Sequence, residues 1–297
     1  MRSWLFVPGD SSKKIDKALA SGADVLLLDL EDSVAPSAKV EARQIVADLL
    51  KTTVRDTSTP KLYVRINALD TGFADADLDQ VVTNGLSGIL LPKCTGGMDV
   101  QHLSAKLAVR EAEADLPDGQ IRIIAIATET ASSLFQLGSY PGSSHRLEAL
   151  TWGAEDLSAD LGAETNRLET GDYTDPYRLA RAMLLMAASS AQVQSIDTVF
   201  TAYKDEAALL RECEAARRDG FTGKMAIHPA QVPIINAVFT PSAETIAEAQ
   251  QIVAAFKANP DAGVVGINGQ MIDKPHLVRA ERVLARAGLH QNSTASA

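Results

Sequence analysis

The sequence predicts an α/β protein that folds as a closed (β/α)8 barrel, the TIM barrel, with a C-terminal helical extension. Eight short β-rich runs alternate with segments of helical apolar spacing along the chain. Eight such units favour closure of a barrel, and 297 residues suit one barrel domain. An open doubly wound sheet is the alternative, but the number of runs and the missing glycine-rich fingerprint after the first run weigh against it.

The strand-like runs are short and mostly apolar, as the strands of a buried parallel sheet are. They cover residues 4–7, 25–30, 62–66, 88–91, 121–127, 149–152, 196–200 and 225–227. The first run stops at Pro8 and Gly9 and the fourth at Pro92, which are turn signals. The second run is apolar except for Asp29. Apolar residues recur at helical spacing between the runs, over residues 37–50, 99–114, 176–191 and 205–219.

The tail of the chain is additional to the barrel. Residues 1–240 are predicted to form the catalytic barrel, and residues 241–297 a C-terminal helical extension or lid that belongs to the same domain. Ser242 is placed to cap a helix that runs to about residue 258. A glycine-rich stretch over residues 263–269 suits a mobile lid. A last helix ends near residue 287, and residues 290–297 are expected to fray.

The overall composition is that of a globular enzyme. Hydrophobic residues make up 46% of the chain and charged residues 22%, which excludes an intrinsically disordered chain. A formal net charge of −10 argues against a nucleic-acid-binding surface. No apolar run approaches the roughly 20 residues needed to span a bilayer, and the cysteines, Cys94 and Cys213, suit a reducing compartment. We therefore expect a cytoplasmic enzyme with neither nucleic acid nor membrane as a partner.

Charged residues gather where the predicted strands end. The residues at these ends are Glu31, Asp32, Arg65, Lys93, Glu129, Glu155 and Asp156. In a (β/α)8 barrel the carboxyl ends of all strands meet at one rim, where catalytic groups lie. Like charges repel one another and lose hydration when they are brought together without a partner, so a purely structural barrel has no reason to gather them. This rim is the predicted active site.

Glu129 and Asp156 are the predicted metal ligands. They follow the fifth and sixth runs, and the five histidines show no metal-ligand spacing. Mg²⁺ takes one or two protein carboxylates and completes its shell with water and substrate oxygens, so Mg²⁺ is the expected cofactor. Neither carboxylate is expected to lie in the core. The alternative is that each forms a salt bridge with a rim lysine or arginine.

Arg65 interrupts a β-branched strand, between Val64 and Ile66. A guanidinium presents a planar fork of donors that can grip a carboxylate or a developing oxyanion, and we favour this role. The alternative is an ion pair with Glu31 or Asp32 that closes the end of the strand.

Short motifs along the chain resemble those of the citrate lyase β-subunit family, part of the HpcH/HpaI aldolase and malyl-CoA lyase group. The motifs are RSWLFVPG at residues 2–9, DLEDSV at 29–34, VRIN at 64–67, LPK at 91–93, ET at 129–130, GAEDL at 153–157, IHPAQ at 227–231 and GQMID at 269–273. They occur in the family's order from residue 2 to about residue 287. The family's fold is a TIM barrel, which agrees with the strand pattern.

The resemblance implies a Mg²⁺-dependent carbon–carbon lyase. Its substrate would be a 3-hydroxy-acyl thioester of malyl, citramalyl or citryl type, bound to CoA or an acyl carrier. Retro-Claisen cleavage would give a 2-oxo acid and an acyl thioester. The alternatives are a malyl-CoA-type thioesterase or malate synthase, and the β subunit of a multi-chain citrate lyase that acts on a carrier-bound substrate.

The resemblance also assigns roles to residues that match the motifs. Glu129 and Asp156 would hold the metal, with Glu129 also at the substrate, and Arg65 would bind the oxo-acid or thioester oxygen. The remaining members of the implied site are the acidic pair Glu31 and Asp32, which support the arginine, and the backbone amides of Gly153 and Ala154, which contact the substrate carboxylate.

Asp273 matches an aspartate on a C-terminal lid that, in malyl-CoA lyase relatives, reaches the site of a neighbouring subunit. The resemblance therefore implies a homo-oligomer, a trimer or a hexamer, in which Asp273 handles the proton on the α-carbon. The alternative is that Asp273 only caps the final helix.

Overall fold

The computed structural model describes residues 1–53 and 59–289. It divides into two compact units, Met1–Asn236 and Ala237–Ala297, and the boundary falls within helix α9, Val232–Phe239. The frayed end predicted over residues 290–297 lies outside the described part of the chain. Among the described residues, no helix combines the length and the apolar character needed to cross a membrane.

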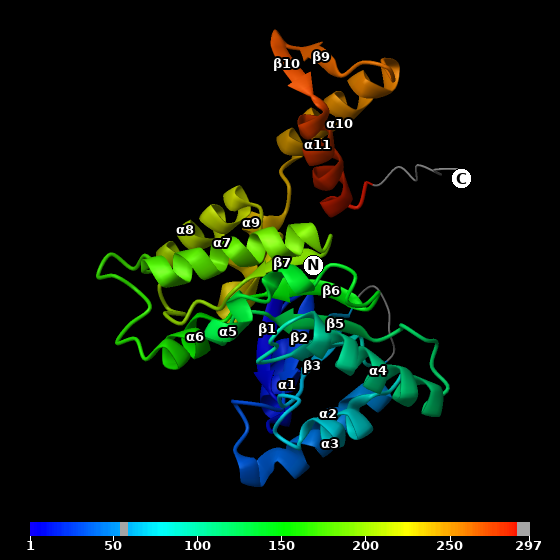
Figure 1. Cartoon of the computed structure of the whole chain (residues 1–297), viewed down its shortest axis with the longest axis vertical. Coiled ribbons are helices and arrows are strands. Elements are labelled where there is room, and N and C mark those ends of the chain that lie inside the picture. The colour runs from blue at the N-terminus through cyan, green and yellow to red at the C-terminus, as the bar shows by residue number, and fades with distance from the viewer. Residues whose placement is uncertain (54–58, 290–297) are drawn as a thin grey trace. The chain divides into compact units, whose positions relative to one another are not determined.

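The first unit is a closed barrel of eight parallel strands in sequential order (Figure 1). The strands are β1 Ser3–Pro8, β2 Val25–Asp29, β3 Lys61–Arg65, β4 Gly88–Leu91, β5 Arg122–Ile126, β6 Leu147–Thr151, β7 Gln194–Asp197 and β8 Gly223–Ala226. Strand β1 pairs with both β2 and β8 and so closes the sheet. The predicted (β/α)8 barrel is confirmed, and the open sheet is excluded. Strands β7 and β8 each begin two residues before the predicted runs, because polar Gln194 and Lys224 also join the ladder.

The barrel is filled by apolar side chains from all of its strands. They form one buried cluster: Trp4, Val25, Leu27, Tyr63, Leu90, Ile124, Ile126, Ala149, Ile196 and Met225. Successive residues of a strand face opposite sides of the sheet, so the residues between these face the surrounding helices. Both faces of β2 are covered, and all five of its residues are buried, which explains its continuous apolar run.

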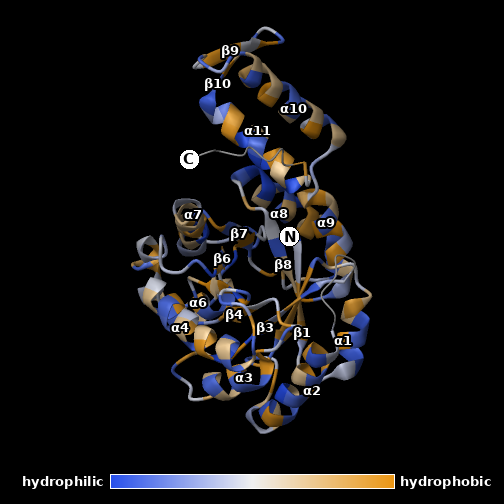
Figure 2. Cartoon of the chain, turned by 90° about the vertical axis from the view of Figure 1, so that its right-hand side faces the viewer, coloured by the Kyte–Doolittle hydropathy of each residue, from blue (hydrophilic) through white to orange (hydrophobic). Residues whose placement is uncertain are grey.

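Helices follow the strands and surround the barrel (Figure 1). They are α1 Ser12–Leu19, α2 Lys39–Thr52, α3 Ala74–Val81, α4 Gly97–Glu113, α5 Ala131–Leu134, α6 Ala154–Leu161, α7 Asp175–Ser190 and α8 Glu206–Asp219, with short 3-10 turns at Pro36–Ala38, Leu137–Ser139 and Pro229–Gln231. Their apolar residues are buried on one side, as Val46 and Leu50 of α2 are. Figure 2 shows this mixture of hydrophobic and hydrophilic residues on each helix.

The second unit contains two helices and a β-hairpin. Helix α10, Ala243–Ala258, begins at the predicted cap, where Ser242 Oγ accepts a hydrogen bond from the Thr245 N–H at 3.2 Å. Strands β9, Val264–Ile267, and β10, Gln270–Asp273, form an antiparallel hairpin that leads into α11, Lys274–Arg286. The hairpin was not predicted. Its turn consists of Asn268 and Gly269, both with positive φ (51° and 77°), which matches the twist of paired strands.

Candidate active site

The predicted rim residues other than Glu155 meet at the carboxyl end of the barrel strands, whereas Glu155 is exposed and accepts a hydrogen bond from Asn166. The residues brought together there are Glu31, Asp32, Arg65, Lys93, Glu129, Gly153, Ala154 and Asp156. They follow or end strands β2 to β6, whose parallel order places these ends at one edge. Direct contacts link the charged members into one cluster, and Gly153 packs against Glu129.

Arg65 is fixed in place by acidic residues. Its Nε and Nη2 donate to the two oxygens of Asp29 at 2.7 and 2.6 Å, a bidentate pair. Its Nη1 lies 3.1 Å from Glu31 Oε2 and 3.2 Å from Asp32 Oδ2. The guanidinium also lies over the ring of Phe6, 4.9 Å from the ring centroid. The ion pair named as the alternative is therefore present, with both Glu31 and Asp32, and it holds the planar group in one orientation.

Asp29 is the principal partner of Arg65 and is a site residue that was not predicted. The residue is 2% exposed, and it also accepts hydrogen bonds from the N–H groups of Glu31 and Ser33. Burial alone would raise the pKa of the Asp29 carboxyl, but the hydrogen bonds and charge of Arg65 hold that pKa below its ordinary value. A single aspartate in an otherwise apolar strand was the signal that could have identified it.

Lys93 connects the acidic residues after β2 with the two carboxylates that follow β5 and β6. Its Nζ lies 2.6 Å from Glu31 Oε1, 3.7 Å from Asp32 Oδ1 and 3.5 Å from Asp156 Oδ1. Its backbone N–H donates to Glu129 Oε2. Lys93 adopts a left-handed backbone with φ 49°, a conformation that non-glycine residues keep only where surrounding contacts compensate its cost. From the sequence this lysine is expected at a strand end, but its position there indicates no role.

Glu129 is buried more deeply than predicted. Its exposed fraction is 3%, so the expectation that it lies outside the core is wrong, whereas the Asp156 side chain is 35% exposed. Burial, with a further contribution from the negative charge of Asp156, raises the pKa of Glu129 to about 8. The barrel wall and the start of α6 exclude water from Glu129, which the position of a residue in the sequence does not reveal.

Gly153 provides the space that Glu129 occupies. A Cβ atom at position 153 would lie 2.7 Å from Glu129 Cγ. Gly153 has an ordinary φ of −115°, so packing rather than backbone conformation requires glycine. Its N–H donates to Thr128 Oγ1 at 3.3 Å. Ala154 and Asp156 lie in the first turn of α6, where N–H groups lack partners within the helix and favour a negative charge.

The donor set suits a small, hard cation. Glu129 Oε2 is held by Lys93, and both Glu129 and Asp156 present carboxylate oxygens, the ligand type that Mg²⁺ prefers. Within residues 1–53 and 59–289 there is no group of three or more His, Cys, Asp or Glu side chains arranged to hold a metal. Two carboxylates are sufficient for Mg²⁺, which keeps several waters and takes substrate oxygens. A divalent cation here would also offset the repulsion from Asp156, which adds to the effect of burial on the pKa of Glu129.

Asp273 belongs to the second unit and lies at the N-cap of α11. Its carboxylate contacts His276 Nδ1, and its side chain is half-exposed. The hydrogen bond from His276 lowers the pKa of Asp273. The helix-capping position named as the alternative is therefore present. Ile272 beside it is buried in the core of the second unit, and Met271 is 79% exposed.

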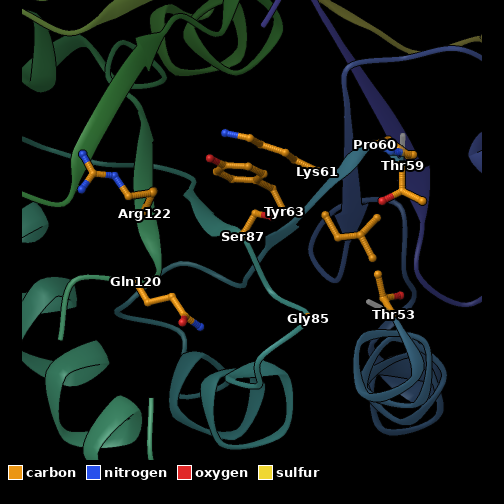
Figure 3. Close-up of a pocket in the computed structure, with 10 residues that line it drawn as sticks. Thr53, Thr59, Pro60, Lys61, Tyr63, Gly85, Ser87, Gln120 and Arg122 are labelled. Atoms are coloured by element: carbon orange, nitrogen blue, oxygen red, sulfur yellow. The ribbon is translucent and has the colours of Figure 1, made fainter. Parts of the chain in front are cut away.

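A separate cavity of about 190 Å³ lies at the opposite end of the barrel strands (Figure 3). Lys61 and Arg122, the first residues of β3 and β5, line it together with Ser87, which precedes β4. None of the predicted site residues lines this cavity. Because (β/α)8 enzymes place their chemistry at the carboxyl ends of the strands, the charged rim remains the candidate active site.

Known proteins resemble this chain along nearly its whole length. Residues 2–229 match the family model described as HpcH/HpaI aldolase/citrate lyase. The citrate lyase subunit beta of Leuconostoc mesenteroides subsp. cremoris is 34% identical over 290 residues, which cover 96% of this chain and 93% of that protein. The mitochondrial citramalyl-CoA lyase of Rattus norvegicus is 33% identical over 302 residues, 96% of this chain and 86% of that protein.

Solved structures show the same fold. The crystal structure of CitE from Mycobacterium tuberculosis, in complex with magnesium, acetoacetate and coenzyme A, superposes with a TM-score of 0.75 at 33% identity and covers 97% of this chain and 98% of that one. The chain belongs to the HpcH/HpaI aldolase/citrate lyase family.

Proposed function

We propose that the protein is a Mg²⁺-dependent carbon–carbon lyase. Its substrate would be a 3-hydroxy-acyl thioester of malyl, citramalyl or citryl type, which it would cleave to a 2-oxo acid and an acyl thioester. The observation that carries the proposal is the convergence of Glu129 and Asp156 with an immobilised Arg65 on one rim. The relatives named citrate lyase subunit beta and citramalyl-CoA lyase support this reaction class.

Glu129 and Asp156 would hold the metal, which supplies a Lewis acid that acidifies the substrate hydroxyl. Glu129 must be ionised to do so, and its raised pKa means that it gives up its proton as the metal binds. Lys93 fixes the orientation of the Glu129 carboxylate, because the backbone N–H of Lys93 donates to one of its oxygens.

Arg65 would stabilise the negative charge that develops during cleavage. The hydroxyl proton passes to solvent water, the bond between the hydroxyl carbon and the thioester α-carbon breaks, and its electron pair passes to the thioester as an enolate. A guanidinium has five N–H donors, and Asp29, Glu31 and Asp32 engage only part of this set. The remaining N–H groups are preorganised donors for the enolate or oxo-acid oxygen.

Gly153 and Ala154 would bind the second carboxylate of the substrate at the first turn of α6. Asp273 would exchange the proton at the α-carbon, as an acid in cleavage and a base in condensation. Its lowered pKa favours the carboxylate, which is the form that condensation needs. We assign Asp273 to the site of a neighbouring subunit in a homo-oligomer.

The test incubates purified protein with malyl-, citramalyl- and citryl-CoA and identifies the products by mass, with Mg²⁺ or with excess chelator. The proposal expects a 2-oxo acid and an acyl-CoA in equal amounts, only with Mg²⁺. Free CoA with intact hydroxy acid would instead identify a thioesterase. Cleavage of only the carrier-bound thioester would identify a subunit of a multi-chain citrate lyase.

A further inference from the structure

Six buried or half-buried side chains form a closed ring of contacts on the outer face of the barrel. They come from the ends of β6 and β7, from β8, from α8 and from the loop before α7: Trp152, Asp197, Lys224, Glu212, Arg167 and Tyr173. Ile196 and Met225 fill the barrel interior, so their neighbours Asp197 and Lys224 face outward, beneath α8. The ring contains none of the rim residues described above.

Charged groups form one side of this ring. Lys224 Nζ donates to Asp197 Oδ2 at 3.0 Å and to Glu212 Oε1 at 2.7 Å, and its exposed fraction is 0%. Glu212 Oε2 accepts from Arg167 Nη1 at 2.9 Å. Arg181, which is not part of the ring, also donates to Asp197, from its Nε at 3.2 Å. Such an array is rigid, because breaking one contact would leave a buried charge without its partner.

Aromatic groups form the other side. Arg167 Nη2 donates to the Tyr173 hydroxyl at 2.6 Å, and the Tyr173 ring meets the Trp152 ring edge to face, with centroids 5.0 Å apart. The indole N–H of Trp152 donates to Asp197 Oδ1 at 2.8 Å and closes the ring. Trp152 is therefore held by packing on one face and by a charge-assisted hydrogen bond at its edge.

Trp152 is the link between this ring and the rim. It follows the last residue of β6 and precedes Gly153, the N-cap of α6. A side chain clamped on the outer face of the barrel fixes the backbone to which Gly153 is joined. The same backbone sets the position of Asp156, the third residue of α6. A displacement of about 1 Å at such a point can reduce the rate of catalysis substantially.

We propose that Trp152 is a positioning residue, anchored by Asp197 and Tyr173, that holds the start of α6 in the geometry needed to bind the oxo-acid carboxylate. The expected effect on the KM for the oxo acid rests on the proposed function, whereas the expected effect on the start of α6 does not. The indole N–H is the critical group, because it joins the backbone at α6 to the charged half of the ring.

Trp152→Phe tests this inference, since phenylalanine keeps an aromatic ring and loses the N–H. The matched control is Trp4→Phe. Trp4 is also fully buried, but its indole N–H has no hydrogen-bond partner among the described residues. These are the two tryptophans of the chain. Hydrogen exchange followed by mass spectrometry reports on the peptide that covers residues 153–161, and steady-state kinetics report on the KM for the 2-oxo acid in the condensation direction.

In Trp152→Phe we expect hydrogen exchange in residues 153–161 to be at least about fivefold faster, consistent with loss of a hydrogen bond to a charged acceptor. We expect the KM for the oxo acid to rise at least about fivefold. Trp4→Phe should change neither quantity. A lower Tm in Trp152→Phe, with unchanged exchange and unchanged KM, would show that the ring serves stability only and would overturn the inference.

The exchange measurement separates this inference from the proposed function. If the wild-type protein has no lyase or condensation activity, the proposed function fails, and the exchange comparison still decides whether Trp152 anchors α6. If Trp152→Phe does not fold, Trp152 is replaced by β-(3-benzothienyl)alanine, which keeps the bicyclic shape of the indole and has sulfur in place of the N–H that donates to Asp197. Unchanged exchange over residues 153–161 in that variant would then overturn the inference.

Discussion

Gly153 packs directly against the side chain of Glu129. A Cβ atom at position 153 would lie 2.7 Å from Glu129 Cγ and 3.4 Å from Glu129 Oε1. The first distance is shorter than any ordinary carbon–carbon contact, so a larger residue must move the carboxylate. The residue type at one end of α6 thus controls the position of a carboxylate at the end of β5.

Gly153→Ala should therefore reduce activity without unfolding the protein. The added methyl displaces Glu129 from its position beside Asp156, and we expect kcat/KM to fall roughly 10- to 100-fold, because small misplacements in an active site have effects of this size. The control is Gly138→Ala, where a Cβ atom would meet nothing within 4 Å. Equal activity of the two variants would contradict the assignment of Glu129.

The raised pKa of Glu129 predicts a pH dependence of stability in the metal-free protein. The native carboxyl has a pKa of about 8, against an ordinary value of 4.5, so between these values the native state binds more protons than the unfolded state. Stability contributed by this group is then present at low pH and is lost as pH rises toward about 8. Urea denaturation in chelator at several pH values measures it.

Glu129→Gln isolates the contribution of this group, because glutamine keeps the shape and does not titrate. The difference in unfolding free energy between wild type and Glu129→Gln should change steadily between pH 4.5 and about 8, in favour of the variant at the higher pH. Mg²⁺ should stabilise the wild type most at the upper end of this range, where Glu129 is ionised. A pH-independent difference would mean that Glu129 is not a buried, protonated acid.

Arg65→Lys keeps the positive charge and loses the planar fork that binds Asp29 at two points. We expect a folded protein that loses at least about 2–3 kcal/mol of transition-state stabilisation, roughly 30- to 150-fold in kcat/KM, by analogy with removal of an oxyanion donor. Kinetics and a thermal melt on the same sample measure the two effects. Wild-type kinetics in this variant would show that Arg65 is only an ion-pair partner.

The assignment of Asp273 to a neighbouring subunit predicts complementation. Inactive Arg65→Ala subunits and inactive Asp273→Ala subunits are mixed under conditions of subunit exchange. Mixed oligomers would contain some sites with both residues intact, so activity should partly return. If exchange is verified and no activity returns, Asp273 serves its own barrel or only caps α11.

The barrel was predictable because its signals are local and repeated. Each strand is a short apolar run between turn signals, and eight such strands favour a sheet that closes into a barrel. The rim followed from the same pattern, since residues after parallel strands share one edge. The Asn268–Gly269 dipeptide is a strong hairpin signal, but a glycine-rich stretch also suits a mobile lid, and the sequence alone does not decide between the two.

The pairings within the site were less predictable, because they depend on side chains that the sequence places far apart. Asp29 and Arg65 are 36 residues apart and form a bidentate pair. The left-handed backbone of Lys93, which aims its N–H at Glu129, has no sequence signal of its own. The burial of the Glu129 side chain likewise depends on the residue that packs against it, Gly153.

The most direct test of the central claim is the rate of 2-oxo acid formation from the best thioester substrate in wild type, Glu129→Gln and Asp156→Asn, each with Mg²⁺ and with excess chelator. Both substitutions keep the side-chain shape and remove the negative charge that holds the cation. The account predicts Mg²⁺-dependent cleavage by the wild type, no detectable cleavage by either variant, and Tm values within a few degrees of the wild type. Full activity of either variant, or of the wild type in chelator, would contradict it.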